Sequence, residues 1–163
     1  MSAGRSSKVM LAAGSRAPEF KLSRVDGAKQ SLGEILKNGP ALLAFYKISC
    51  PVCQLTAPYL ERLSSSAQIQ VIGISQDDDG STRGFLDRFG VTFPTLLDQS
   101  QAGYPASNAY GISSVPSLFL VERDGQVSRS FSGFSKRDLA DLGAMAGVPL
   151  FQPGDDVPDW KAG

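Results

Sequence analysis

Two cysteines set three positions apart, Cys50 and Cys53, are the residues of this sequence best suited to chemistry. The chain has 163 residues and no other cysteine. Cys50 comes shortly after the apolar run 41–46 (ALLAFY), which is typical of a strand buried on both faces. Apolar residues then recur at helical spacing from Pro51 onward. We therefore expect the cysteine pair to lie where a strand passes into a helix.

That position favours a nucleophilic thiolate at Cys50. A sulfur at a helix N-cap can meet the amides that the first turn leaves without partners, and the helix dipole favours negative charge there. Both effects lower a thiol pKa from its usual ~8.5. Pro51 suits the first helical position because it has no amide hydrogen to satisfy. Cys53 lies one turn on, where it can form a disulfide with Cys50 and support two-electron exchange.

The composition excludes several other kinds of chemistry. The sequence has no histidine, which removes histidine-based acid–base catalysis, Ser-His and Cys-His pairs, and histidine metal sites. Two thiols are too few for a four-cysteine zinc or iron–sulfur site in one chain. Basic and acidic residues balance at 16 each, so we expect no nucleic-acid partner and no membrane partner. No cofactor is expected either. Without an evident leader or spanning segment, a cytoplasmic location is expected unless a leader has been removed.

The pattern of apolar runs and turn signals predicts one α/β domain over residues 17–149. A flexible lead-in of residues 1–16 precedes it, and a loosely built tail of residues 150–163 follows. Alternating strands and helices imply a parallel sheet, and a later hairpin about Asp124-Gly125 adds an antiparallel edge. The expected strands are 17–22, 29–32, 41–46, 69–75, 92–97, 117–122 and 126–131.

Capping residues mark the expected helices. Ser31 and Glu34 have the spacing of a capping box. Residues 51–65 form the helix after the cysteine pair, and Ser81 is expected to cap a helix that ends at Gly90. A last helix is expected to start after Ser135 and to place Leu139, Leu142 and Met145 on one face. The run Asp77-Asp78-Asp79-Gly80 is interpreted as a turn into the helix that Ser81 is expected to cap, not as a cation site.

Two motifs resemble the active site of the thioredoxin superfamily. The segment 45–53 (FYKISCPVC), with Pro58 five residues after the second cysteine, resembles its CxxC segment. Val115-Pro116 resembles its cis-proline loop, which faces the CxxC pair and binds substrate backbone. Segments 14–22 (GSRAPEFKL) and 93–98 (FPTLLD) are similar to the peroxiredoxin (AhpC/TSA) and TlpA-like branch. This resemblance implies a thioredoxin-like fold: a central mixed sheet flanked by helices, with an N-terminal β-hairpin extension.

The sequence departs from thioredoxin at three places. Ser49 stands where thioredoxin has tryptophan, and Pro-Val replaces Gly-Pro between the cysteines. Ala44 stands where thioredoxin has the aspartate that accepts a proton from the second thiol. The reduction potential is therefore open between reductant and oxidant, roughly −270 to −120 mV. Lys47, three residues before Cys50, is a candidate thiolate stabiliser or simply a solvated strand end.

The peroxiredoxin signature Pro-x-x-x-Thr-x-x-Cys fits in neither register. Alignment on Cys53 places Tyr46 and Cys50 at its proline and threonine positions. Alignment on Cys50 places Leu43 and Lys47 there. Peroxide reduction therefore ranks below disulfide exchange.

The sequence thus predicts a thiol–disulfide oxidoreductase with Cys50 as nucleophile and Cys53 as resolving cysteine. Pro51, Val115 and Pro116 are the expected substrate-binding residues. The expected substrate is a protein or small-molecule disulfide, and an external thiol supplies electrons. Three alternatives stay open: an atypical peroxiredoxin acting on hydroperoxides, a thiolate metal-binding module, and a degenerate domain used only for interaction.

Overall fold

A seven-stranded mixed sheet forms the centre of the computed structural model, which describes residues 9–163. The central strand β3 (Ala41–Tyr46) is buried along its whole length. Strands β4 (Gln70–Ser75) and β5 (Thr95–Leu97) continue the sheet in parallel on one side. The remaining neighbours pair antiparallel, in the overall order β2-β1-β5-β4-β3-β6-β7: β1 (Lys21–Arg24), β2 (Lys29–Ser31), β6 (Ser117–Val121) and β7 (Val127–Ser132).

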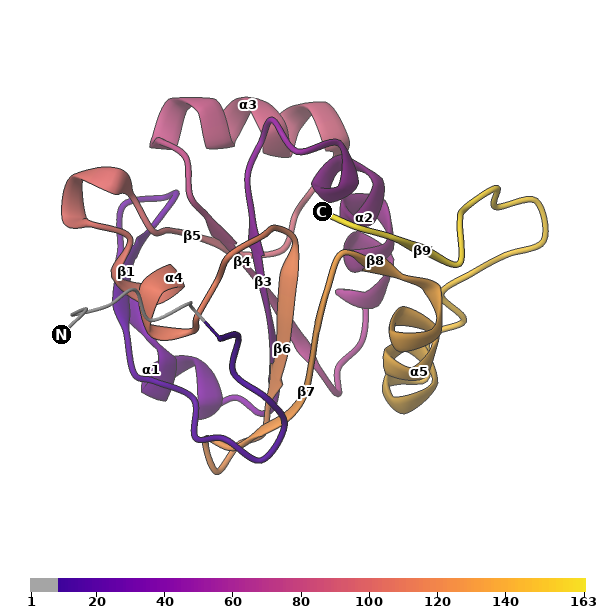
Figure 1. Ribbon diagram of the computed structural model, residues 1–163, viewed down its shortest axis with the longest axis horizontal. Helices are drawn as coiled ribbons and strands as arrows, with labels where there is room; N and C mark the ends of the chain where they lie inside the picture. The colour runs from indigo at the N-terminus through magenta and orange to yellow at the C-terminus, as the bar shows by residue number, and fades with distance from the viewer. Residues whose placement is uncertain (1–8) are drawn as a thin grey trace, which may run out of the picture.

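Helices cover both faces of this sheet (Figure 1). Alternate residues of β3 point to opposite faces, so Leu42 and Ala44 join one core cluster while Leu43 and Phe45 join the other. The first cluster packs under α2 (Pro51–Leu63), α3 (Asp79–Phe89) and α5 (Lys136–Ala146). The second packs under α1 (Leu32–Leu36) and α4 (Pro105–Ala109), with a 3-10 turn η1 (Ser100–Ala102) before α4. The predicted fold class and its N-terminal hairpin β1–β2 are confirmed.

Local signals for helix ends were mostly right. The capping box of Ser31 and Glu34 is present at α1, and Ser135 caps α5. The predicted cap of α3 is wrong: the carboxylate of Asp78, not Ser81, caps it and accepts from the Ser81 amide at 2.7 Å. Ser81 lies inside the first turn, where its amide needs a partner, and Asp78 is the acceptor three residues earlier.

Two further expectations need correction. The strand expected over 92–97 is shorter, β5, because Pro94 has no amide to donate to a ladder. Met145 does not lie on the inner face of α5, since its side chain is 48% exposed. At roughly 100° per residue the buried stripe runs from Leu139 and Leu142 to Ala146, seven positions after the first.

Both ends of the described chain are bound to the domain. Residues 9–16, expected to be flexible, are hydrogen-bonded, for example from the Gly14 amide to Val127 O at 2.8 Å; the rest of that lead-in lies outside the described residues. The tail is not loosely built. Leu150 is buried, Asp155 pairs with Arg62 at 2.7 Å, and β9 (Trp160–Lys161) pairs with β8 (Phe134–Ser135). Its irregular Pro/Gly-rich sequence gave no sign of these distant partners.

Within residues 9–163, no helix combines the length and the apolar character needed to cross a membrane.

Candidate active site

Cys50 lies at the N-cap of α2, as its sequence position predicted. Its backbone is extended, with φ −83° and ψ 116°, and its Sγ accepts a hydrogen bond from the Cys53 amide at 3.2 Å. Pro51 occupies the first helical position. An amide donor and the positive end of a 13-residue helix both favour a negative sulfur at this place.

Cys53 lies one turn further into α2 and is in a different environment. Its side chain is only 3% exposed, while Cys50 is half-buried, and both are free thiols. Burial raises the pKa of the Cys53 thiol, and its hydrogen bond with Cys50 raises it further. Cys53 therefore stays protonated while Cys50 is the thiol that solvent and a substrate can reach.

The Val115–Pro116 peptide bond is cis and faces the cysteine pair. Strand β6 starts at Ser117, which pairs with Phe45 near the end of β3, so the preceding loop is brought beside α2. The Cys50 thiol donates to the Val115 carbonyl oxygen at 3.4 Å. Of the three predicted substrate-binding residues, the structure thus places Val115 against Cys50, with Pro116 next to Val115 in the cis peptide and Pro51 next to Cys50 in the chain.

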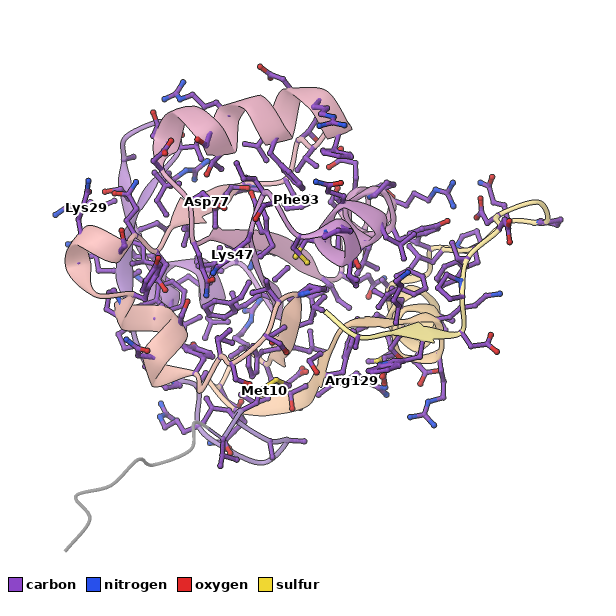
Figure 2. All side chains as sticks on the ribbon, turned by 45° about the horizontal axis from the view of Figure 1, so that its top comes forward. Met10, Lys29, Lys47, Asp77, Phe93 and Arg129 are labelled. Atoms are coloured by element: carbon purple, nitrogen blue, oxygen red, sulfur yellow. The ribbon has the colours of Figure 1, made fainter. Side chains whose placement is uncertain are left out.

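The short loop between β3 and α2 is held from both sides. The Ile48 amide donates to Asp77 Oδ2 at 2.8 Å, and the Ile48 carbonyl accepts from Gln54 Nε2 at 2.9 Å. Asp77 follows β4, the parallel neighbour of β3, and it lies near Lys47 at the same end of the sheet (Figure 2). Sequence analysis missed this function of Asp77. A usable signal was present, because the carboxyl ends of adjacent parallel strands meet at one edge of a sheet.

A cleft of about 540 Å³ opens beside Cys50. Lys47 is exposed and lines this cleft, so the structure brings it to the site, and no carboxylate of residues 9–163 forms an ion pair with it. Residues of α4 also form a wall of the cleft, where the Ser107 hydroxyl accepts from Gln76 Nε2 at 2.8 Å. The completely buried carboxylate of Asp98 binds the start of α4, accepting from the Ala106 and Ser107 amides at 3.0 and 2.7 Å. Two buried or partly buried polar side chains, Asp98 and Gln76, therefore hold the α4 wall of the cleft in place.

Comparison with known proteins agrees with this geometry. The Redoxin family model matches residues 12–146. The thiol–disulfide oxidoreductase ResA of Geobacillus thermodenitrificans is 31% identical over 137 residues, which cover 81% of this chain and 76% of that protein. The chain belongs to the redoxin family.

Solved structures share the fold of this redoxin at low identity. The thioredoxin domain of a thiol–disulfide oxidoreductase from Bacteroides vulgatus superposes with a TM-score of 0.72 at 21% identity, covering 83% of this chain and 97% of that one. Peroxidoxin BcpB from Mycobacterium tuberculosis superposes with a TM-score of 0.68 at 23% identity, covering 83% and 98%. With its Cys50–Cys53 pair, the redoxin is a thioredoxin-like thiol–disulfide oxidoreductase.

The position of thioredoxin's buried aspartate is taken by Ala44 in this redoxin, and the buried polar side chains in its neighbourhood are those of a tyrosine and a threonine. Ala44 is buried in the same core cluster as Cys53 and offers no proton acceptor. The next inward residue of β3 is Tyr46, whose hydroxyl is buried, and burial raises its pKa to about 12. Neither its hydroxyl nor that of Thr95 makes a hydrogen bond of ordinary geometry within residues 9–163, although the hydroxyls of Thr95 and Ser75 lie close enough to Tyr46 to lower its pKa in part. A carboxylate that acts on this region electrostatically is Asp77, whose charge raises the pKa of both Cys53 and Tyr46.

Within the described part of the redoxin, no three Cys, Asp or Glu side chains form a cluster able to hold a metal ion.

Proposed function

We propose that the redoxin reduces disulfides through Cys50, with Cys53 resolving the intermediate. The observation that carries this assignment is the contrast within the pair. Cys50 is accessible at the N-cap, and its sulfur accepts a hydrogen bond from the Cys53 amide. Cys53 is buried, and its thiol pKa is raised.

The proposed reaction has two exchange steps. The Cys50 thiolate attacks one sulfur of the substrate disulfide, forms a mixed disulfide and releases the other substrate sulfur as a thiolate. Cys53 then loses its proton and attacks Cys50 Sγ, so that the Cys50–Cys53 disulfide forms and the second substrate thiol leaves. When Cys50 is bonded to substrate, the hydrogen bond between the two cysteines that raises the Cys53 pKa is lost. Attack by substrate therefore itself favours the second step.

Val115, Pro116 and Pro51 are proposed to bind the substrate beside the reacting sulfur. The Val115 carbonyl is within 3.4 Å of Cys50 Sγ, and Pro51 is exposed at the start of α2. An external thiol of unassigned identity is proposed to return electrons to the Cys50–Cys53 disulfide. A hydroperoxide substrate stays an alternative. If the reduced protein consumed hydrogen peroxide no faster than an ordinary free thiol does, this alternative would be excluded.

Two serine variants test the assignment of roles. Cys50→Ser is expected to abolish reduction of insulin disulfides by dithiothreitol through the protein. Cys53→Ser is expected to form a stable mixed disulfide with substrate, seen by mass spectrometry under non-reducing conditions. If Cys53→Ser turned over insulin and Cys50→Ser trapped it, the two roles would be reversed.

A cytoplasmic location is likewise proposed from the sequence alone. Recovery of the native protein in the cytosolic fraction of its source cells, and not in an exported or membrane fraction, would support it. Recovery in either other fraction would refute it.

A further inference from the structure

The last residues of the chain run as an added strand toward the active site. Strand β9 pairs antiparallel with β8, with Lys161 opposite Phe134 and Trp160 opposite Ser135. The Lys136 amide extends the pairing by donating to Asp159 O at 2.9 Å. Figure 1 shows this segment in yellow, returning beside β8 toward the start of α2.

Gly163 of this segment packs against the Val115 carbonyl, which also accepts the hydrogen bond of the Cys50 thiol. Gly163 lies so close to the cis-proline loop that a Cβ added to it would overlap Val115 O and lie 3.2 Å from the Pro116 nitrogen. The Cys50 thiol also donates to Val115 O. Gly163 lines the cleft beside Cys50 and Pro51. The tail therefore covers backbone that an incoming polypeptide would need.

This terminal segment is attached more weakly than the tail that leads to it. Residues 158–163 are exposed, and Trp160 is 58% exposed. The anchors lie earlier: Leu150 is 3% exposed, and Asp155 pairs with Arg62 at 2.7 Å. The terminal strand can therefore leave β8 while the anchors keep the rest of the tail in place.

We infer that β8 and the Val115–Pro116 loop form a binding site for an extended polypeptide, which residues 160–163 occupy until a disulfide-bearing polypeptide displaces them. The inference rests on the proposed function of Cys50 and adds the substrate class and its control. Backbone pairing with a sheet edge accepts many sequences, since the main chain supplies the hydrogen bonds. A small disulfide can reach Cys50 without pairing with β8 and needs no displacement.

The single tryptophan of the chain reports on this exchange directly, because it is Trp160. In a Cys53→Ser background, Cys50 is coupled to a tryptophan-free peptide whose cysteine carries thionitrobenzoate; Cys50 displaces thionitrobenzoate and keeps the peptide. A matched sample carries mercaptoethanol on Cys50, added in the same way. We expect the fluorescence anisotropy of Trp160 to fall with the peptide and to stay unchanged with mercaptoethanol.

Release of thionitrobenzoate tests the proposed function of Cys50, and the anisotropy of Trp160 tests the displacement of the tail. Failure of Cys50 to release thionitrobenzoate in both samples would refute the proposed function. Coupling of the peptide with unchanged Trp160 anisotropy would leave that function intact and overturn the tail inference.

A one-methyl variant tests the same point in kinetics. Gly163→Ala places its methyl against Val115 O and should expel the segment, whereas Gly84→Ala adds a methyl to a helical position with nothing within 4 Å. If the tail fills the site about nine-tenths of the time, its release should raise kcat/KM for insulin up to ~10-fold. Reduction of 2-hydroxyethyl disulfide, which does not pair with β8, should rise less than reduction of insulin in Gly163→Ala, and neither should change in Gly84→Ala. Equal kcat/KM for insulin in Gly163→Ala, Gly84→Ala and the parent protein would overturn the inference.

Discussion

The cysteine pair shows how much chemistry two residues can specify when their place in the chain is known. Spacing and the buried run before Cys50 were enough to predict its N-cap position, and the structure adds the 3.2 Å bond from the Cys53 amide. What the sequence could not show is the difference in exposure within the pair. That difference depends on the loop at Val115 and on core residues that are distant in sequence.

Asp77 offers a residue-level test of the loop that carries Cys50. Asp77→Ala removes the acceptor of the Ile48 amide, while Asp77→Asn keeps an oxygen there without the charge. A hydrogen bond to a charged group is worth about 1.5–3 kcal/mol, so Ile48 amide exchange should accelerate by roughly 10- to 100-fold in Asp77→Ala. The measurement is native-state hydrogen exchange by NMR. Unchanged Ile48 protection in Asp77→Ala would show that Gln54 alone holds the loop.

Tyr46 gives a pH-dependent prediction with a defined sign. Its pKa is raised from 10.0 to about 12, so above pH 10 the unfolded chain binds fewer protons at this site than the folded one. The stability supplied by neutral Tyr46 is complete below pH 10 and is lost as pH rises toward 12, at about 1.4 kcal/mol per pH unit. In Tyr46→Phe, the free energy of unfolding measured by urea denaturation should therefore fall less steeply between pH 10 and pH 12 than in the parent protein.

Tyr110→Phe is the matched comparison for Tyr46→Phe. The Tyr110 hydroxyl donates to Pro18 O at 2.8 Å, so its removal leaves a carbonyl without that donor and should cost about 0.5–1.5 kcal/mol at pH 7. The Tyr46 hydroxyl makes no hydrogen bond of ordinary geometry within the described residues, so its removal should cost less than that of the Tyr110 hydroxyl at pH 7. An equal loss at pH 7 in the two variants would contradict this assignment.

At the scale of elements, the best predicted parts were those with a local signal. Strand β3 and helix α2 follow from one apolar run and one proline, and α1 follows from its capping box. Helix α4 has no comparable local signal, because its decisive partner is a carboxylate outside it. The sequence shows Asp98 only as the end of the segment 93–98, yet Asp98 binds two amides of α4.

Asp98 therefore determines whether the α4 wall of the cleft forms. Asp98→Ala leaves the Ala106 and Ser107 amides buried without this acceptor, and we expect a loss of about 2–4 kcal/mol in the free energy of unfolding. Asp98→Asn keeps one acceptor oxygen and should cost less. Urea denaturation of both variants measures the difference. If Asp98→Ala unfolded at the urea concentration of the parent protein, the carboxylate would not be what holds α4.

At the scale of the whole molecule, the tail was the largest failure of sequence-based prediction. Its contacts join residues about 90 positions apart, as in the hydrogen bonds from Arg62 to Asp155 and to Leu150 O. Phe151 also packs its ring 4.8 Å from that of Tyr59. No periodic pattern within residues 150–163 could indicate such partners, because they belong to α2 and not to the tail.

Two truncations of different length separate the two parts of this tail. Removal of residues 159–163 takes away only the exposed strand pairing with β8 and should change the urea midpoint little. Removal of residues 150–163 also exposes the ring of Tyr59 and the site of buried Leu150, which alone contributes about 1.5–3 kcal/mol. Against a total stability of about 5–15 kcal/mol, that loss should lower the midpoint clearly. Leu150→Ala in the full chain is the matched control and should reproduce much of the loss. Equal midpoints for the two truncations would mean that the anchors stabilise nothing, and that the tail is held by its terminal strand.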